Sequence, residues 1–419
     1  MSQVEKEITR KNIELANINP ELVKRREIES KLRVIKPGAF ESFRPLAVQL
    51  DAVYLSNPED EFSLRVRREK AAEGFIYSAT LKDRGRVVNG VKNRLEINVD
   101  TLSQEAYDYY ANTPQFVPFQ QFRTQITNEM SIDYIEGHDS IIEIETADDD
   151  IRAGLMKDLD GLVEVKSHDR QFDKESIAHM LAGREALNSP ESLDSFSTRV
   201  ADEMIAQYVS GKNQVVVGLT GMSGSGKTTA TKAIRERIID LIGDAYAPLV
   251  ISTDDYHFGK TKLDAINGEP WTQWDDKRTY NTAELANDIT LMAQGKHLIR
   301  RHFDFDTEEP AFDEEVAPSP FVIVEGLYAG SKDLEAVRDL HFNLPTSIAT
   351  SIGRDVRRLV IENRANRVFP TPESRLKYQL ETALPLFLEQ QKPTRNSFSA
   401  SVRPMADRAF MLSLLTARQ

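Results

Sequence analysis

Cysteine is absent from the 419 residues of this chain. Its absence excludes disulfides, thiolate metal sites and cysteine nucleophiles. Long apolar runs are also missing, and the first residues, MSQVEKEITRKN, lack the apolar centre of a secretory signal. We therefore expect a cytoplasmic protein that has no membrane partner.

An excess of basic residues is missing too, because 53 Lys and Arg stand against 66 Asp and Glu, a formal net charge of −13. Binding to a nucleic-acid backbone rewards a basic face, so we expect no nucleic-acid partner, although a local basic cavity stays compatible with this charge. The length predicts two or three domains. The oligomeric state is left open, a homo-oligomer included.

The pattern of apolar residues changes along the chain. Residues 1–24 are polar and are expected to form an extension. In residues 25–187, short segments of period two, such as FSLRVRRE and FIYSATLKD, alternate with turn-rich stretches and precede a helix, which predicts an antiparallel β-barrel or sheet. Residues 188–198 are the expected linker. In residues 199–419, apolar strands alternate with helices, which predicts an α/β domain with a parallel sheet.

A glycine-rich segment, GMSGSGKT at residues 221–228, lies between a strand pattern and a helix pattern. Its glycines let successive N–H groups point at phosphate oxygens, Lys227 adds a charge for the β- and γ-phosphates, and the Thr228 hydroxyl is placed to bind Mg²⁺. A strand–helix turn without a ligand is the alternative. The residues expected to bind ATP or GTP are Gly221, Ser223, Gly224, Ser225, Gly226, Lys227, Thr228 and Thr229.

Acidic residues follow two other strand patterns. Glu325 ends the run FVIVEG, where open α/β sheets place their ligands, and is expected to hold the hydration shell of the metal. A kinase also needs a group that orients or takes the proton of the acceptor hydroxyl, and Asp254 and Asp255 follow PLVIST. One of these two is the candidate base. Solvated strand-end and turn acids are the alternative for all three residues.

The chain resembles the uridine kinase and phosphoribulokinase group of P-loop kinases over residues 212–410. The resemblance rests on GLTGMSGSGKTT, VISTDDYH, WDDKRTYN, HFDFD and FVIVEGLYA, which occur in this order. It implies that Asp254 is the base and Lys227 the catalytic lysine. It also implies that Asp275, Tyr256 and Phe303 contact the acceptor.

Two parts of this resemblance are less regular. Arg364 and Arg367, in IENRANRVFP, resemble the lid arginines that close over the phosphates, and helix-surface charges or salt-bridge partners are the alternative for them. Uridine kinases follow their Tyr-Asp-Phe with a histidine and an arginine, whereas residues 303–310 read FDFDTEEP. Uridine is therefore not the expected acceptor, and a small hydroxyl-bearing metabolite, nucleoside-like or sugar-like, is.

Charged side chains share one face of several strands expected in the first domain. Side chains two residues apart point to the same side of a strand, as Arg65 and Arg67 do. A solvent-facing surface is one explanation. The other is a closed barrel with a charged interior, in which basic residues hold a polyanion and glutamates bind Mg²⁺ or Mn²⁺.

The order of these charged segments resembles the CYTH, or triphosphate tunnel, family over residues 25–175. The matching pieces are EIESK, LRVR, TLK, the Arg and Glu of RLE, Arg123 and EIE. The resemblance implies a domain that binds an inorganic or nucleoside triphosphate with metal. The phosphate-binding residues implied are Lys31, Arg65, Arg67, Lys82, Arg94, Arg123 and Lys166. The metal ligands implied are Glu27, Glu29, Glu143 and Glu145.

Both resemblances together predict a bifunctional enzyme, in which a small-molecule kinase follows a tunnel that binds or hydrolyses triphosphate. Two alternatives stay open. In one, only the tunnel is catalytic and the P-loop domain is a nucleotide-binding regulator. In the other, the tunnel is a sensor that controls the kinase.

Overall fold

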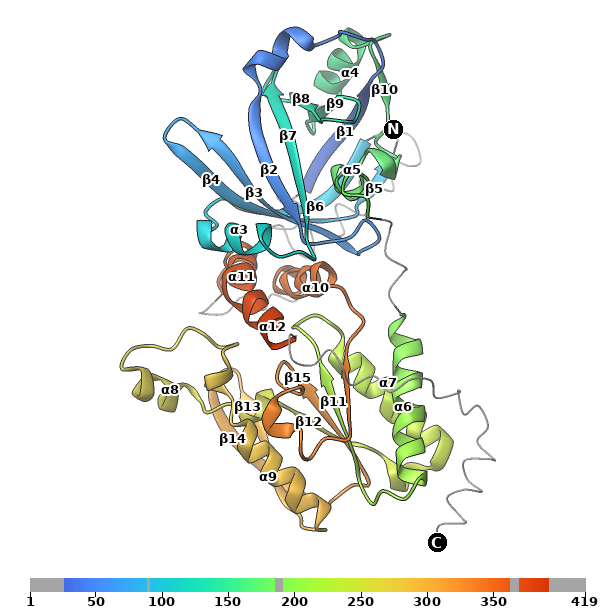
Figure 1. The fold of residues 1–419 in the computed structure, drawn as a ribbon, viewed down its shortest axis with the longest axis vertical. Coiled ribbons are helices and arrows are strands. Elements are labelled where there is room, and N and C mark those ends of the chain that lie inside the picture. Colours follow the sequence, from blue (N-terminus) through green and yellow to red (C-terminus); the bar gives the residue numbers. More distant parts are fainter. Residues whose placement is uncertain (1–25, 89–90, 185–190, 362–368, 392–419) are drawn as a thin grey trace. The chain divides into compact units, whose positions relative to one another are not determined.

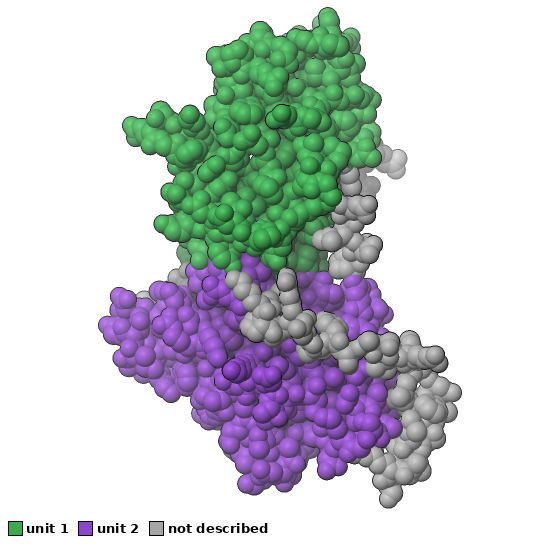
Figure 2. Space-filling model, viewed as in Figure 1, with its two compact units in different colours: residues 1–189, 347–381 green, residues 190–346, 382–419 purple. Residues whose placement is uncertain are grey.

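The structure is a computed structural model that describes residues 26–88, 91–184, 191–361 and 369–391. It forms two compact units, and each is treated by itself below (Figure 2). Unit 1 comprises residues 1–189 and 347–381, and unit 2 comprises residues 190–346 and 382–419. The expected extension at residues 1–24 and the two arginines Arg364 and Arg367 lie outside the described residues.

Antiparallel strands form the main body of unit 1. The pairing of β1 with β6 closes eight of the described strands into a barrel, in the order β1-β9-β8-β7-β2-β3-β4-β6, with β10 and β5 added beside β1 and β6 (Figure 1). The prediction of an antiparallel β-barrel is confirmed. The strands are β1 (Arg26–Val34), β2 (Val48–Tyr54), β3 (Phe62–Ala71), β4 (Gly74–Asp83), β5 (Arg86–Val88), β6 (Val91–Val99), β7 (Val117–Gln125), β8 (Met130–Tyr134), β9 (Ile141–Glu145) and β10 (Val163–Val165).

Strand β3 shows how the sequence builds both faces of this barrel. Arg65 and Arg67 face the interior cavity. Phe62, Leu64 and Val66 alternate with them, so they point to the outer face, and each is 0% exposed. The outer face of the barrel is therefore covered here, which an alternation of charged and apolar residues alone does not predict.

Helices supply this cover. Helix α3 (Gln104–Ala111) and helix α10 (Ile348–Ile361) pack against β3, α10 also packs against β4, and α11 (Pro372–Tyr378) packs against β6 and α10 (Figure 1). Ala349, Ile352 and Val356, at helical spacing along α10, are 0% exposed. The π-helical turn η7 (Gln379–Ala383) follows, and the Tyr110 hydroxyl donates a hydrogen bond to the carbonyl oxygen of Leu380.

The remaining helices of unit 1 lie in the N-terminal part of the chain. They are η1 (Glu41–Leu46), α4 (Asp149–Asp158), η2 (Arg170–Phe172) and α5 (Lys174–Leu181). Helix α5 falls within the helix expected before the linker. The predicted limits make each domain a continuous stretch of sequence. The compact units differ from this, because residues 347–381 belong to the unit that contains the barrel. The domain limits therefore stay a prediction.

Unit 2 is built on a parallel sheet with the strand order β12-β15-β11-β16, as predicted for an α/β domain. One face packs α6 and α7 through Val215, Val217 and Ile323, and the other packs α9 through Val216 and Val322. Burial on both faces explains the continuous apolar runs. The elements are α6 (Leu193–Val209), β11 (Val215–Thr220), α7 (Lys227–Ile242), η3 (Asp244–Tyr246), β12 (Leu249–Ser252), η4 (Asp254–Tyr256), α8 (Lys260–Asn267), η5 (Lys277–Thr279), α9 (Thr282–Ala293), β15 (Phe321–Gly326), η6 (Lys332–Leu334), β16 (Leu340–Asn343) and α12 (Leu384–Gln391).

A separate antiparallel hairpin, β13 (Leu298–Asp304) and β14 (Glu309–Val316), was not expected from the sequence. Its turn, residues 305–308, lies in the middle of the segment that departs from the uridine kinases. Helix α6 begins at Leu193, so the second half of the expected linker is helical. None of the helices within the described ranges has both the length and the apolar character that a membrane crossing requires.

Candidate functional site

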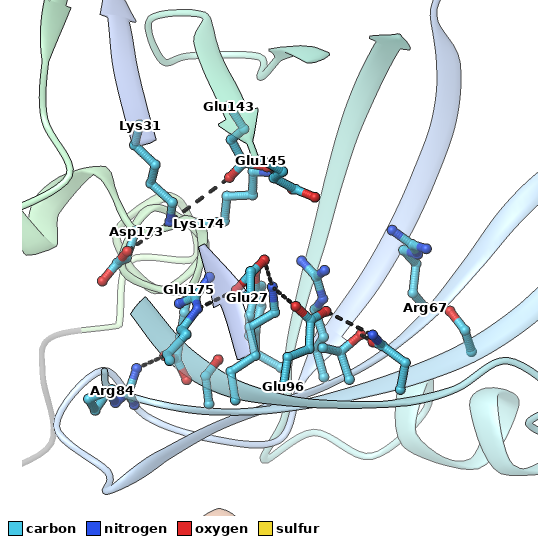
Figure 3. A pocket seen from close by; sticks show the side chains of 18 of the residues that line it. Glu27, Lys31, Arg67, Arg84, Glu96, Glu143, Glu145, Asp173, Lys174 and Glu175 are labelled. Carbon is cyan, nitrogen blue, oxygen red and sulfur yellow. Dashed lines mark hydrogen bonds and ion pairs between the residues drawn. The ribbon is translucent and has the colours of Figure 1, made fainter. Parts of the chain in front are cut away.

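The barrel of unit 1 encloses a cavity of about 270 Å³ with a charged lining (Figure 3). Six of the seven phosphate-binding residues expected from the sequence lie on it, as do three of the four expected metal ligands. The basic side chains of the lining are Lys31, Arg65, Arg67, Lys82, Arg84, Arg94, Arg123 and Lys174. The acidic ones are Glu27, Glu96, Asp100, Glu143, Glu145, Asp173 and Glu175.

Glu27 lies at the centre of the first group of ion pairs in this cavity. Its two carboxylate oxygens are each 2.5 Å from a cation, Lys82 Nζ and Arg94 Nε respectively. Although burial opposes ionisation, these two neighbours hold the pKa of Glu27 well below its ordinary value. The carboxylate is therefore ionised, and its charge is neutralised by side chains of the protein.

A second group surrounds Glu143, on the neighbouring strand β9. Arg123 Nη2 lies 2.5 Å and Lys174 Nζ 2.7 Å from the Glu143 carboxylate, and both cations also contact Asp133, which is 0% exposed. Burial opposes the ionisation of Glu143, but Lys174 and Arg123 hold its pKa well below the ordinary value. Glu143 is thus paired with cations of the protein, and it is not part of the group that the other three expected metal ligands form.

Arg65 and Arg67 differ from the other cations of the lining. Arg65 makes no ion pair with a described residue, and the nearest carboxylate oxygen to Arg67, on Glu69, is 3.7 Å away. The Nε atoms of both are buried without a hydrogen-bond partner in the described structure. Burial and the charge of Arg65 lower the pKa of Arg67 to about 10, so it stays charged at neutral pH. Arg65 is hydrogen-bonded to Tyr54, but neither guanidinium group has a close carboxylate partner among the described residues, which favours an anionic ligand.

The three glutamates Glu27, Glu29 and Glu145 bring one carboxylate oxygen each within 4.8 Å of one another. Oε1 of Glu29 is buried and accepts no hydrogen bond of normal geometry, although Arg94 Nη2 is 2.7 Å away. An oxygen-only set with one unsatisfied oxygen fits a hard divalent cation such as Mg²⁺ or Mn²⁺. These residues therefore fit the metal that the resemblance implies.

Lys166 is the expected phosphate-binding residue that the structure does not place on the cavity. Its ammonium lies 3.0 Å from Glu164 and over the ring of Phe172. Instead, the cavity receives Asp173, Lys174 and Glu175, at the start of helix α5. These three residues lie at the start of a helix, so they do not follow the period of two that marks most of the other lining residues. Their only signal in the sequence is a charged triplet at a helix start.

The phosphate loop of unit 2 has the geometry that its sequence predicts. It connects β11 to α7, and Gly224 and Gly226 take φ angles of 78° and 91°, which side chains rarely adopt. A Cβ atom at Gly221 would lie 2.4 Å from Ser225 Oγ, so the loop has no room for one there. Lys227 donates hydrogen bonds to the carbonyl oxygens of Gly221 and Met222, at 3.1 and 3.2 Å, which holds its ammonium over the loop.

Asp254 and Asp255 have different surroundings, which separates the two candidate bases. Asp255 accepts hydrogen bonds from the backbone N–H groups of Ser252 and Phe303, both at 3.4 Å, and so connects β12 to β13. Burial raises the pKa of Asp254 to about 6; Lys227 opposes the rise, and Glu325 and Asp275 add to it. Asp255 therefore connects two strands, whereas Asp254 lies near Lys227 and two further acids.

Glu325 closes this group at the end of β15. Burial raises its pKa while Lys227 opposes the rise. Its Oε2 atom is buried without a hydrogen-bond partner in the described structure. A half-buried carboxylate with an unsatisfied oxygen fits the metal-binding role expected for it with Thr228, the first residue after Lys227 in α7.

Aromatic rings lie next to the acids along the chain. The ring of Phe303 is 4.6 Å from that of His257 and 6.4 Å from that of Trp274. Burial lowers the pKa of His257 to about 4, so its imidazole is neutral at pH 7. The backbone carbonyl of Asp275 accepts a hydrogen bond from the Tyr328 hydroxyl at 2.7 Å. Asp275 is thus close enough to Asp254 to raise its pKa, whereas Phe303 contacts the neighbouring Asp255 through its backbone N–H.

Tyr256 is placed differently from the other expected acceptor residues. Its hydroxyl donates a 2.9 Å hydrogen bond to Asp288 of α9, and its ring packs in the apolar core on that side of the sheet.

The acidic segment that departs from the uridine kinases also has a local role. Glu309 accepts a 2.7 Å hydrogen bond from the N–H of Thr261, in the first turn of α8.

The chain combines a closed barrel that has a charged interior with an α/β unit that carries a P-loop. Residues 216–358, in the C-terminal half of the chain, match the family described as Phosphoribulokinase / Uridine kinase family. The prediction of a uridine kinase-like P-loop domain is confirmed.

Relatives with curated functions match at low identity. The chain is 25% identical over 207 residues to a uridine kinase of Alkaliphilus metalliredigens, which covers 49% of this chain and 94% of that protein. It is 28% identical over 191 residues to inorganic pyrophosphatase TTM2 of Arabidopsis thaliana, which covers 42% of this chain but only 26% of that protein. Among solved structures, a putative fructose transport system kinase from Silicibacter sp. TM1040 matches with a TM-score of 0.39 and 18% identity, over 47% of this chain and 94% of that one.

Proposed function

We propose that the chain is a bifunctional enzyme: unit 2 transfers the γ-phosphoryl group of ATP or GTP to a hydroxyl of a small metabolite, and the barrel of unit 1 binds and hydrolyses a triphosphate. The position of Asp254 among Lys227, Glu325 and Asp275 supports the kinase most directly. The guanidinium groups of Arg65 and Arg67, each with a buried Nε atom that has no hydrogen-bond partner in the described structure, support the tunnel.

The kinase chemistry follows from the positions of these side chains. The acceptor hydroxyl attacks the γ-phosphorus, the bond from that phosphorus to the β–γ bridging oxygen breaks, and the nucleoside diphosphate leaves. Asp254 takes the hydroxyl proton, for which a pKa of about 6 suits neutral pH. Lys227 and the N–H groups of the loop stabilise the negative charge on the phosphates.

The acceptor we propose is nucleoside-like or sugar-like and carries no phosphate. The half-buried Trp274, whose ring packs against the buried rings of Phe303 and the neutral His257, offers an aromatic side chain on which a flat or weakly polar group packs. Around Asp254 the nearby charged groups are Lys227 and the two acids Glu325 and Asp275. Two carboxylates beside the base disfavour a second anionic group on the acceptor.

In the tunnel, we propose that the basic side chains hold the triphosphate while water attacks its terminal phosphorus, releasing phosphate and the shortened chain. Binding requires an exchange of partners, because Glu27 and Glu143 already neutralise Lys82, Arg94, Arg123 and Lys174. Mg²⁺ or Mn²⁺, when bound to the glutamates of the tunnel or to Thr228 and Glu325, would neutralise and align the phosphates.

The alternatives keep one catalytic unit and make the other a regulator or a sensor. They are separated by incubating γ-³²P-labelled ATP with a panel of nucleosides, sugars and other alcohols, using the unaltered chain, Lys227→Ala and the double variant Glu27→Ala/Glu29→Ala. Transfer to an acceptor that does not depend on Lys227 would refute the kinase proposal. Tripolyphosphate hydrolysis that survives the loss of both glutamates would refute the tunnel hydrolase.

The pH dependence of phosphoryl transfer should report Asp254. Because the base acts when deprotonated and its pKa is about 6, kcat/KM should fall about tenfold for each pH unit below about 6 and level off above it. Asp254→Asn should remove most of the activity, whereas Asp264→Asn, in helix α8, should keep the profile. A profile that is unchanged between pH 5 and 7 would contradict the assignment.

Metal dependence of the tunnel should follow its glutamates. Glu27→Gln/Glu29→Gln should lower tripolyphosphate hydrolysis about 100-fold or more, because two of three oxygen ligands lose their charge. The same variant should lose bound Mn²⁺ in an electron paramagnetic resonance titration. Glu164→Gln, whose side chain is 49% exposed and outside the cavity lining, is the matched control. Full Mn²⁺ binding by the double variant would place the metal elsewhere.

A further inference from the structure

The match to the kinase family extends beyond residue 346, where the first segment of unit 2 ends. The family match runs to residue 358, yet residues 347–381 are part of unit 1. Helices α10 and α11 cover the apolar outer face of β3, β4 and β6. The opposite face of these same strands lines the charged cavity. A helix of the kinase family thus lies directly behind the strands that we propose bind triphosphate.

Arg84 connects the cavity to the β2–β3 loop, residues 55–61. Its side chain lines the cavity, and its Nη1 is 2.5 Å from the Glu175 carboxylate (Figure 3). The same guanidinium donates to two carbonyl oxygens of the loop, from Nε to Asp60 at 2.7 Å and from Nη2 to Asn57 at 2.6 Å. One arginine therefore holds both a lumen acid and the backbone of the loop.

The loop in turn holds the first turns of α10. The Asp60 carboxylate is hydrogen-bonded to Ser347, the residue before the helix. The Glu61 N–H donates to Thr350 Oγ1 at 3.1 Å, and the Glu61 carboxylate lies 2.8 Å from Arg354 Nε. Any displacement of the loop therefore acts on the start of α10.

The residue before Ser347 contacts the phosphate loop. Within unit 2, the Thr346 hydroxyl donates a hydrogen bond of 2.6 Å to the carbonyl oxygen of Ser225, in the middle of the glycine-rich segment. Thr346 and Ser347 share a peptide bond. One of them is tied to the P-loop, and the next is tied to the loop that Arg84 holds.

We propose that Arg84 makes the phosphate loop sensitive to the occupancy of the tunnel, an inference that rests on the proposed triphosphate function of unit 1. A polyphosphate in the cavity competes with Glu175 and with the loop carbonyls for the guanidinium of Arg84, since a hydrogen bond to a charged phosphate oxygen is stronger than one to a neutral carbonyl oxygen. When Arg84 turns toward the ligand, residues 55–61 lose two hydrogen bonds. The first turn of α10 and the Thr346 contact to the P-loop then become more mobile.

Hydrogen–deuterium exchange of the full chain tests this proposal. The Lys227→Ala background weakens any binding of tripolyphosphate at the P-loop, and Mg²⁺ with tripolyphosphate is the probe. We expect slower exchange in strands β3 and β6, which reports binding in the cavity. We expect exchange about threefold faster or more at the start of α10 and in residues 221–228.

Two further variants in the same background sharpen the test. Arg84→Gln should exchange rapidly at α10 without ligand and should no longer respond to it. Arg44→Gln, at a side chain that is 60% exposed, should behave like its parent. Protected barrel strands with unchanged or slower exchange at α10 and the P-loop would overturn the coupling, and so would slow ligand-free exchange in Arg84→Gln. No protection of the strands would instead refute triphosphate binding, and the coupling with it.

Discussion

Replacing Lys227 with alanine should lower phosphoryl transfer by about two to three orders of magnitude. The reason is electrostatic, because Lys227 is the cation around which Asp254 and Glu325 lie, and the transferred phosphoryl group carries negative charge on its oxygens. Steady-state kinetics with the accepted alcohol would measure the effect, and the loss should appear in kcat as well as in kcat/KM.

The fold should survive this substitution. Lys227 is half-buried, and among the described contacts it donates hydrogen bonds to two carbonyl oxygens of the loop and to no carboxylate. Asp254 and Glu325 lose a nearby positive charge but no hydrogen bond. Lys232→Ala is the matched control, because Lys232 lies on the same helix with a side chain that is 76% exposed. Kinetics of Lys227→Ala that match those of Lys232→Ala would remove the lysine from the mechanism.

Replacing Arg67 with alanine should weaken tripolyphosphate binding in the tunnel about 10- to 100-fold, the equivalent of about 1.5–3 kcal/mol for a charge-assisted hydrogen bond. Arg65→Ala should have a similar effect, and the double variant should lose more than either. Isothermal titration calorimetry in the Lys227→Ala background would measure the tunnel alone. Neither substitution should cost much stability, because neither arginine leaves a close carboxylate unpaired.

The adjacent residue provides the control for this prediction. Arg68 points to the opposite side of β3, where it pairs with Asp51 at 2.9 Å and its side chain is 37% exposed. An exposed pair of this kind contributes about 0–1 kcal/mol to stability and touches no lumen ligand. Arg68→Ala should therefore bind tripolyphosphate like the parent chain. Equal losses in Arg67→Ala and Arg68→Ala would indicate a general effect of charge instead of a site in the lumen.

The charged face of the barrel was predictable because strand geometry is simple. Period two placed Arg65 with Arg67 and Arg94 with Glu96 on one side of their strands, and all four line the cavity. Strands β2 and β7 were missed, since VQLDAVY and VPFQQFRTQ carry polar residues or a proline within the strand. The common interior of the barrel could not be read from any single segment, because it forms only when β1 pairs with β6.

The residues that the sequence did not predict come from irregular positions. Lys174 begins a helix and Arg84 follows the last residue of β4, so neither carries a strand signal. The packing of α10 on the barrel was also not predictable. Ala349, Ile352 and Val356 mark an apolar stripe, but a stripe does not tell which sheet it covers.

In the kinase unit, the sequence points to residues that follow strand ends, and their roles stay proposals. Parallel strands end at one edge of the sheet, which is why Lys227, Asp254 and Glu325, distant in sequence, influence one another. Tyr256 shows the limit of motif reasoning, because a residue beside the base can point into the core, where its hydroxyl bonds Asp288.

The balanced charge of the lumen has a consequence for how a ligand arrives. A chain with a net charge of −13 repels a bare polyphosphate at long range, and a cavity with eight basic and seven acidic side chains offers little attraction to offset this repulsion. A polyphosphate already complexed with divalent cations carries less negative charge. When its oxygens take the basic side chains of the lining away from their acidic partners, the bound cations can pair with those acids. The tunnel is therefore suited to capture the complex as a unit, and the rate of capture depends on how much of the polyphosphate circulates in that form.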